Sequence, residues 1–497
     1  MNRRDFIKLS ALSTAYPAVC AAGNRRKPNI IILMADDIGW SNPSCMGSTF
    51  YETPNVDRIA AEGIVFTHAY SPANKCSPSR AATQTGIYPA DLGIRRLKLP
   101  NYQSDCYLPN PLKENGYTTC HVGKWHAAPW SRMPKDVGYD HVRLAIKKGH
   151  QESLFWPYTK SGKVERKLDF PELVKNGSEG DYLTDKLGDA AIEFIEDNKS
   201  KPFFLNLCFY NVHVPVGTTD KYKKHFIDKI KRAAREVPTC NQSRVIKGST
   251  DYNYLYAGAM KQMDDNIGRI LDKLDELKIA DDTFVIFVGE NGTKMTVANS
   301  KPLREGKNSP YEGGMRMPMI ARYSPMITPK SRTETPAILM DLFPTIMDMT
   351  GSSIPKAHKK RLGGVSLTEV FRNPNHKIAR PLYWLMYPST IQYTSMGKDE
   401  YCLPFESMVE GNWKLIHFRP CYLMNEHYEL YNIEKDISEK NDLAKEMPEK
   451  VKDMAKKLAD WQETTLVKNA DYDPDEYSLQ AMENARASRK KSKKEKK

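Results

Sequence analysis

The sequence predicts an α/β fold, with an open and mostly parallel sheet between helices, and a smaller C-terminal α+β subdomain. Four short, continuous apolar runs occur along the chain, as is typical of strands that are covered on both faces. Segments with apolar residues at three- and four-residue spacing lie between these runs and predict helices. Strands that alternate with helices indicate a parallel sheet, in which ligands bind beyond the carboxyl ends of the strands.

Polar residues follow each of the four predicted strands. The strands are residues 30–34, 118–122, 203–210 and 283–288, and the clearest helices are 181–196 and 252–277. The polar residues are Asp36 and Asp37 after the first strand, Lys124 and His126 after the second, His213 after the third, and Glu290 and Asn291 after the fourth. A single carboxylate at a strand end would be explained equally well by a core or loop-capping role. Four strand ends with complementary groups favour one site at one edge of the sheet.

The pattern changes after about residue 375. Gly411-Asn412 interrupts an apolar stretch as in a hairpin, residues 428–433 predict a strand, and residues 448–463 predict a helix. We therefore expect a large domain over 28–375, an α+β subdomain over 376–468 and a polar, basic tail over 469–497.

Most of the positive charge lies at the two ends of the chain. The net charge is +13, of which residues 1–27 carry +5 and residues 486–497 carry +7, so the remainder is +1. A nearly neutral body argues against a surface that is built to bind nucleic acid. The basic tail is expected to be solvated and disordered, with a tether to a polyanion as the alternative.

Residues 1–22 have the form of an export signal. Arg3-Arg4 precede a short apolar run that ends near Cys20, and Ala21-Ala22 offer a peptidase site. The paired arginines favour the twin-arginine type, with a general secretory signal or a cytosolic extension as alternatives. Lipid anchoring at Cys20 is disfavoured, and no apolar run reaches the roughly 18 residues of a transmembrane helix. We therefore expect a periplasmic or secreted protein.

The most specific local motif is Cys76-Ser77-Pro78-Ser79-Arg80. Pro78 suits the first turn of a helix and Gly86 suits its end, so Cys76 is expected at or just before a helix N-terminus. Such a position favours an anion or a nucleophile, and a buried structural thiol is the alternative. The nine cysteines include no CxxC pair, so we expect no structural zinc site.

Six segments in register resemble the type I, formylglycine-dependent sulfatase family of the alkaline phosphatase superfamily. They are residues 53–63, 76–86, 123–126, 289–292, 306–316 and 429–432. The resemblance covers about residues 28–465. It implies an alkaline-phosphatase-like fold in which the domain over 28–375 is catalytic, in agreement with the predicted sheet.

The resemblance also implies that a maturation enzyme oxidises Cys76 to formylglycine, an aldehyde that hydrates to a geminal diol. Asp36, Asp37, Glu290 and Asn291 are implied to bind a divalent cation together with the residue made from Cys76. Their hard oxygens suit Ca²⁺ or Mg²⁺, whereas a soft thiolate would be a mismatched neighbour. The family usually has Asp at the position of Glu290, and the added methylene favours Ca²⁺, whose coordination shell is the more flexible.

The implied reaction starts with attack of one diol oxygen on the sulfur of a sulfate monoester. The alcohol leaves, and the second hydroxyl then loses its proton and expels sulfate. Arg80 and Lys124 are implied to hold the diol, and Lys307 to bind the sulfate oxygens. His126 is the implied base for the elimination, and His213 is the implied acid for the leaving oxygen, a role that Lys307 can share.

We therefore predict an exported sulfatase that acts on a sulfated sugar or polysaccharide. Candidate specificity segments are residues 147–158, 221–231 and 383–387, for which internal packing is the alternative role. A phosphodiester or phosphonate monoester hydrolase of the same superfamily is one alternative function. A catalytically silent glycan-binding protein is another, which only Glu290 supports. Ser77 is a minor alternative nucleophile.

Overall fold

The computed structural model describes residues 26–94, 107–127, 132–165, 168–236, 253–387, 392–393, 401–468 and 472–478. The predicted export signal, Cys20 and most of the predicted tail lie outside the described residues. Within these ranges, no helix combines the length and apolar character that crossing a membrane requires.

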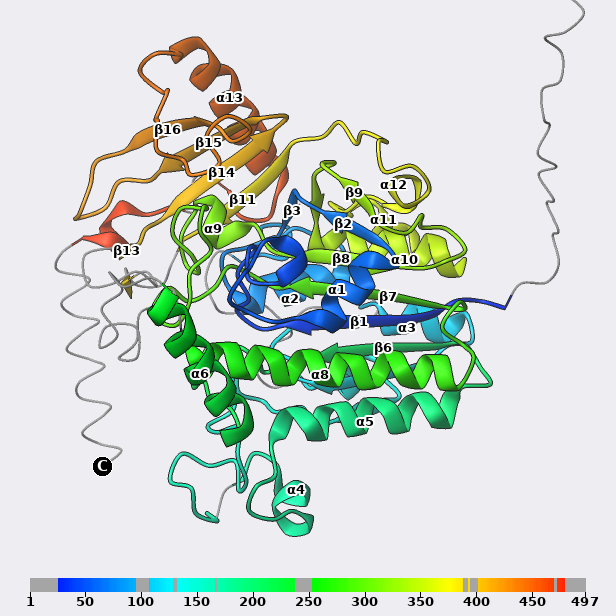
Figure 1. Ribbon diagram of the computed structural model, residues 1–497. Coiled ribbons are helices and arrows are strands. Elements are labelled where there is room, and N and C mark those ends of the chain that lie inside the picture. Colours follow the sequence, from blue (N-terminus) through cyan, green and yellow to red (C-terminus); the bar gives the residue numbers. More distant parts are fainter. Residues whose placement is uncertain are drawn as a thin grey trace, which may run out of the picture.

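An eight-stranded sheet forms the central layer of the molecule (Figure 1). Its order is β5-β4-β6-β1-β7-β8-β2-β9. The strands are β1 (Asn29–Ala35), β2 (Ile64–Phe66), β4 (Thr118–Gly123), β5 (His141–Arg143), β6 (Phe203–Cys208), β7 (Thr283–Gly289), β8 (Met319–Arg322) and β9 (Ser331–Thr333). Only β8 runs antiparallel to its neighbours, β7 and β2. The predicted mostly parallel sheet and its four predicted strands are therefore confirmed.

Helices cover both faces of this sheet, and alternate side chains of β1 therefore pack in a different core on each face. Ile31 and Leu33 pack in the core shared with α5 (Leu183–Asn198) and α8 (Tyr254–Glu276), which lie together on one side (Figure 1). Ile30 and Ile32 pack in the opposite core, with α3 (Pro109–Glu114) and α10 (Leu342–Thr350). All of β1 is buried, which explains its continuous apolar sequence.

Further elements complete the described part of the main domain. The helices are α1 (Pro54–Ala61), α2 (Cys76–Thr85), α4 (Pro171–Asn176), α6 (Asp220–Glu236), α9 (Glu312–Met315), α11 (Lys356–Lys359) and α12 (Thr368–Arg372). Two short strands, β3 (Ala69–Tyr70) and β10 (Ala337–Ile338), pair with each other beside the main sheet.

A second, antiparallel sheet forms the C-terminal subdomain (Figure 1). Its strands are β11 (Leu382–Met386), β14 (Phe405–Glu410), β15 (Trp413–Phe418) and β16 (His427–Asn432), and α13 (Pro448–Thr464) packs on it. A separate pair joins β12 (Gln392–Tyr393) to β13 (Tyr401–Cys402). The predicted hairpin, strand and helix are all present, and the exact domain boundaries stay a prediction.

A buried ion pair joins this subdomain to the main domain. Lys414 Nζ, on β15, lies 3.0 Å from Glu312 Oε1 and 2.8 Å from Glu439 Oε1. Arg316 Nε also donates to Glu312, at 2.7 Å. Burial alone would raise the pKa of Glu312, but Lys414 and Arg316 lower it to about 2. The pair therefore fixes α9, close in sequence to Lys307, against the C-terminal sheet.

We expect Lys414→Met to reduce the free energy of unfolding by about 3–5 kcal/mol, because it removes the cation beside Glu439 and leaves Glu312 with Arg316 alone. Lys457→Met is the matched control. Lys457 is 40% exposed and pairs with Glu410 and Asp453, so its loss should cost far less. Urea unfolding of both variants measures the difference, and equal losses would contradict a structural role for the buried pair.

Candidate active site

The order of the sheet brings the predicted strand ends together. Strands β4, β6, β1 and β7 are consecutive neighbours, and all three pairings are parallel. Their last residues are in register, since Gly123 is opposite Cys208 and Ala35 is opposite Gly289. The residues that follow these strands therefore leave the sheet at one edge, as predicted.

Two buried lysines neutralise the two carboxylates that follow β1. Asp36 and Asp37 are both 0% exposed. Lys124 Nζ donates to Asp36 Oδ2 at 2.6 Å, and Lys307 Nζ donates to Asp37 Oδ1 at 2.5 Å. Burial alone would raise the pKa of Asp37, but Lys307, His213 and Lys124 hold it below its usual range. Asp37 therefore stays ionised.

Helix α2 presents Cys76 and Arg80 to the same edge. Cys76 is the first residue of α2 and Gly86 ends the helix with φ 71°, as the motif predicts. Cys76 is 8% exposed, and its Sγ lies 3.4 Å from Nδ1 of His126. Arg80 Nη1 donates to the carbonyl of Lys124 at 2.8 Å, which ties the helix to the end of β4.

Glu290 lies against the cations of the site. Its Oε2 forms an ion pair with Arg80 Nε, and its Oε1 lies 3.5 Å from Lys124 Nζ. Burial raises the pKa of Glu290 to about 7, although Arg80 opposes the shift. The side chain thus connects α2 with the end of β4.

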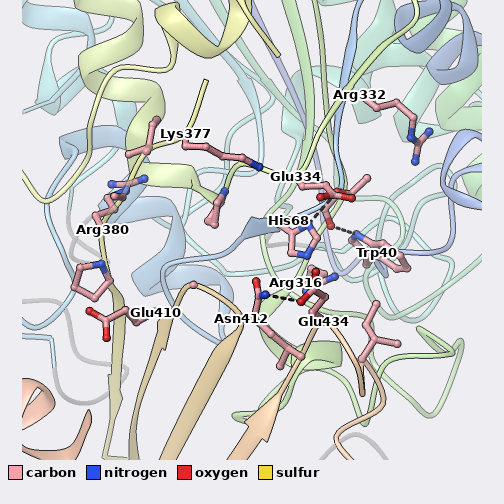
Figure 2. A pocket seen from close by; sticks show the side chains of 18 of the residues that line it. Trp40, His68, Arg316, Arg332, Glu334, Lys377, Arg380, Glu410, Asn412 and Glu434 are labelled. Atoms are coloured by element: carbon pink, nitrogen blue, oxygen red, sulfur yellow. Dashed lines mark hydrogen bonds between the residues drawn. The ribbon is translucent and has the colours of Figure 1, made fainter. Parts of the chain in front are cut away.

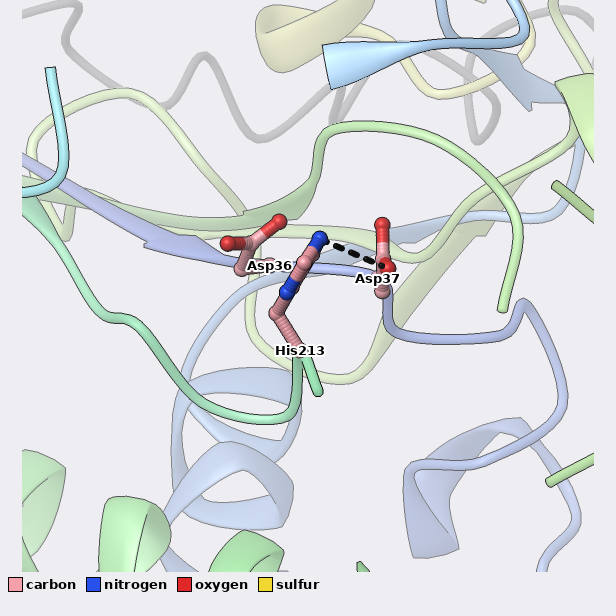
Figure 3. A group of neighbouring side chains, drawn as sticks. All are labelled: Asp36, Asp37 and His213. Atoms are coloured by element: carbon pink, nitrogen blue, oxygen red, sulfur yellow. Dashed lines mark ion pairs between the residues drawn. The ribbon is translucent and has the colours of Figure 1, made fainter. Parts of the chain in front are cut away.

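The remaining oxygens fit a hard divalent cation. Asp36, Asp37 and His213 each place one ligand atom within 4.8 Å of the others, and Figure 3 shows the imidazole directed toward both carboxylates. Asp36 Oδ1, Asp37 Oδ2 and Asn291 Oδ1 are buried and receive no hydrogen bond within the described part of the chain. Such oxygens are costly unless a cation binds them, and they suit Ca²⁺ or Mg²⁺. Neither Glu290 nor Cys76 belongs to this close group, so their roles as ligands stay predictions.

Both predicted catalytic histidines are neutral at pH 7. Burial lowers the pKa of His126 and of His213 to about 3. His213 Nδ1 donates to the carbonyl of Val214 at 2.6 Å, and its Nε2 lies 3.6 Å from Asp37 Oδ2. A neutral His126 suits a base, whereas His213 must first gain a proton to serve as an acid.

The sequence did not reveal a second histidine beside His213. The ring of His150 stacks on that of His213, with centroids 5.6 Å apart. His150 lies in the segment 147–158, for which the sequence predicts either a role in specificity or internal packing, and no role in proton transfer. A contact between two loops leaves no periodic pattern in the sequence. The only sequence feature that could have indicated a role for His150 is the glycine next to it, Gly149.

The three candidate specificity segments differ in their surroundings. Tyr158, Trp384 and Tyr387 are buried, in agreement with the alternative of internal packing. The segment 221–231 on α6 borders a surface hollow of about 490 Å³ together with Lys261 and Asp265 of α8. None of these observations identifies a ligand.

A larger groove, of about 800 Å³, lies between the main domain and the C-terminal hairpin (Figure 2). Trp40, His68, Lys377 and Asn412 are among the residues that line it. It contains none of the predicted site residues. The predicted site residues therefore lie outside this groove.

The family assignment agrees with this geometry. The sequence profile of the sulfatase family matches residues 28–352, which include every predicted site residue. This chain belongs to the sulfatase family. A second profile, described as the C-terminal part of N-sulphoglucosamine sulphohydrolase, matches residues 306–464. The fold is therefore that of the alkaline phosphatase superfamily, and the sulfatase is a sulfuric ester hydrolase.

Similar proteins extend over most of the sulfatase. A sulfatase of Formosa agariphila is 29% identical over 89% of each chain. The human N-acetylgalactosamine-6-sulfatase is 30% identical over 76% of this chain and 72% of its own. The crystal structure of Ps i-CgsB, also solved with k-i-k-neocarrahexaose, is 26% identical, has a TM-score of 0.71 and covers 90% of this chain and 96% of its own.

We expect removal of divalent cations to lower the Tm of the sulfatase, because Asp36 Oδ1, Asp37 Oδ2 and Asn291 Oδ1 are then left buried without a partner. A cation at about 100 times its Kd adds about 2.7 kcal/mol to the free energy of unfolding. Thermal melts in EDTA, and after addition of Ca²⁺ or Mg²⁺, measure this effect. Asp37→Asn should lose most of the rise in Tm, whereas Asp348→Asn, which is exposed on α10, should keep it. An equal rise in both variants would place the cation elsewhere.

Proposed function

We propose that this sulfatase is exported and hydrolyses a sulfate monoester of a carbohydrate, with formylglycine made from Cys76 and a bound divalent cation. Asp36, Asp37 and Asn291 would hold the cation, with Glu290 beside them. Ca²⁺ suits this set better than Mg²⁺, because Glu290 requires a flexible shell. The observation that carries the proposal is the convergence of Arg80, Lys124 and Lys307, each paired with a buried carboxylate, at the edge of the sheet where Cys76 lies against His126.

When present, formylglycine supplies an oxygen nucleophile and the cation lowers the pKa of that oxygen. The residues of this chain then supply position and charge. Arg80 is fixed by Glu290 and by the carbonyl of Lys124, so its guanidinium is already oriented when substrate binds. Preorganised cations of this kind stabilise negative charge that develops during the reaction.

Two residues can donate a proton to the leaving oxygen. Lys307 already carries the proton, whereas His213 must first gain it. Burial alone would lower the pKa of Lys307, but Asp37 raises it above its usual range, so its ammonium stays protonated. His213 is neutral, and the negative charge of a bound sulfate ester would favour its protonation. We therefore assign the acid role to His213 with a contribution from Lys307.

His126 is the base of the second step. Its Nδ1 lies 3.4 Å from Cys76 Sγ, and the pKa of about 3 keeps the ring able to accept a proton. Its position therefore suits removal of a proton from the group that replaces the thiol.

A carbohydrate substrate is supported by two of the similar proteins. The human relative is named for N-acetylgalactosamine 6-sulfate, and Ps i-CgsB was solved with a carrageenan hexasaccharide. Residues 1–22 support export, and the modification of Cys76 requires a maturation enzyme as partner. Initial rates on aryl sulfate and aryl phosphate esters separate the sulfatase from a phosphorus-directed hydrolase, because the latter would prefer the phosphate.

We expect the tryptic peptide that contains Cys76 to be about 18 Da lighter than its unmodified mass when the protein is produced with a maturation enzyme. Intact-peptide mass spectrometry measures the shift. Cys76→Ala should reduce release of inorganic sulfate about 10³-fold or more, because the nucleophile is lost.

Cys421→Ser is the control for this experiment. Cys421 is a free, half-buried thiol in the C-terminal subdomain, and its substitution should leave sulfate release unchanged. An unmodified Cys76 in fully active protein would refute the proposed nucleophile. Sugar binding by modified, cation-loaded protein without any sulfate release would favour the glycan-binding alternative.

A further inference from the structure

A stacked pair of imidazoles lies at the predicted leaving-group side of the site. The rings of His150 and His213 have centroids 5.6 Å apart and planes inclined by 12°. His213 follows β6 and its side chain is 13% exposed, whereas His150 follows β5 and is exposed. The outer ring therefore covers one face of the inner ring, which limits the orientations that the inner ring can adopt.

Both rings are held by the same local hydrogen bond. His150 Nδ1 lies 2.8 Å from the carbonyl oxygen of Gln151, and His213 Nδ1 lies 2.6 Å from that of Val214. A carbonyl only accepts, so each Nδ1 carries the hydrogen. This arrangement leaves Nε2 of His213 as the atom that exchanges a proton with the site.

The loop that carries His150 is anchored on both sides. Tyr210, which is fully buried, donates from its hydroxyl to the carbonyl of Leu144 at 3.0 Å. Lys148 Nζ pairs with Glu152 at 2.7 Å and with Asp169 at 3.1 Å. These contacts fix the position of the loop, and therefore of His150, relative to β6 and His213.

The same loop lies directly on His126. A Cβ at Gly149 would stand 2.6 Å from Cε1 and 2.9 Å from Nδ1 of His126, closer than side chains allow. Gly149 is thus required for the backbone to pack on this ring. One loop therefore contacts both predicted proton-transfer histidines. Gly149 packs on His126, and the ring of His150 stacks on His213.

We propose that His150 is a positioning residue that holds the ring of His213 in the orientation for proton transfer to the leaving oxygen. This inference rests on the proposed function, in which His213 is the acid. Without the stack, the hydrogen bond from Nδ1 to the carbonyl of Val214 would remain, and the ring of His213 would tilt about it into the space that His150 leaves. General acid catalysis requires that the donor lies within hydrogen-bond distance of the leaving oxygen, so such rotation should slow the first step.

The test compares aryl sulfates whose leaving phenols differ in acidity. 4-Nitrophenyl sulfate needs little help from an acid, whereas phenyl and 4-methoxyphenyl sulfate need more. His150→Ala should lower kcat about 10- to 100-fold for the last two esters and less than about threefold for the first. KM should stay within about twofold, because the proposed role of His150 is to orient His213 and includes no contact with substrate.

Two further variants distinguish positioning from other roles. His150→Phe retains a flat ring over His213 and should restore kcat to within about threefold of the wild-type protein. Gly149→Ala should instead bring the kcat of the three esters toward one common value, because it displaces His126, which acts after the phenol has left, in a step that no longer depends on the phenol. His376→Ala, at an exposed site in the segment between α12 and β11, is the control and should change nothing.

The outcomes separate this inference from the proposed function. Equal losses on all esters with His150→Ala, or no loss at all, would overturn the positioning role. A His150→Phe variant as slow as His150→Ala would also overturn it, because the imidazole itself would then be required. A modified, cation-loaded wild-type protein that releases no sulfate from any ester would count against the proposed function instead.

Discussion

Six charged side chains from the carboxyl ends of β4, β1 and β7, from α2 and from the loop before α9 pack together, and the rest of the site depends on their mutual pairing. Lys124 pairs with Asp36, Lys307 with Asp37, and Arg80 with Glu290. The largest side-chain exposure among the six is 11%, for Lys307. An unpaired charge at this depth would cost several kcal/mol, so each pair needs the strand or helix that carries its partner. Fold and site are therefore inseparable at this edge of the sheet.

The formal charges of these three pairs cancel. A divalent cation added to such a balanced set leaves an excess of positive charge in a place with little access to water. A sulfate ester offsets part of that excess, because it is a monoanion that keeps its charge at neutral pH. Binding of the cation and binding of an anionic substrate should therefore strengthen each other. The neutral state of His126 and His213 fits the same balance, because a further buried positive charge would be unfavourable.

Local patterns in the sequence predicted the parts of the site that come from single elements. The four strands were recognisable because both of their faces are buried, and Pro78 and Gly86 marked the ends of α2 by their backbone preferences. The polar residues after each strand were predicted to meet, and the order of the sheet brings them to one edge. The antiparallel placement of β8 was not predictable, because it depends on pairing between segments far apart in the chain. The partners of Glu290 and the stack of His150 on His213 were not predictable for the same reason.

The burial of α2 also limits when an enzyme can reach Cys76. All ten residues of α2 are buried, and Cys76 retains an exposure of 8%. A second enzyme cannot enclose a side chain in such surroundings without unfolding the helix and the segments packed around it. Any enzymatic conversion of Cys76 must therefore act on the nascent or unfolded chain, and a molecule that folds first would be permanently closed to it. The fraction of modified protein would then depend on the rate of modification of Cys76 relative to the rate of folding. Slower synthesis or folding would increase this fraction.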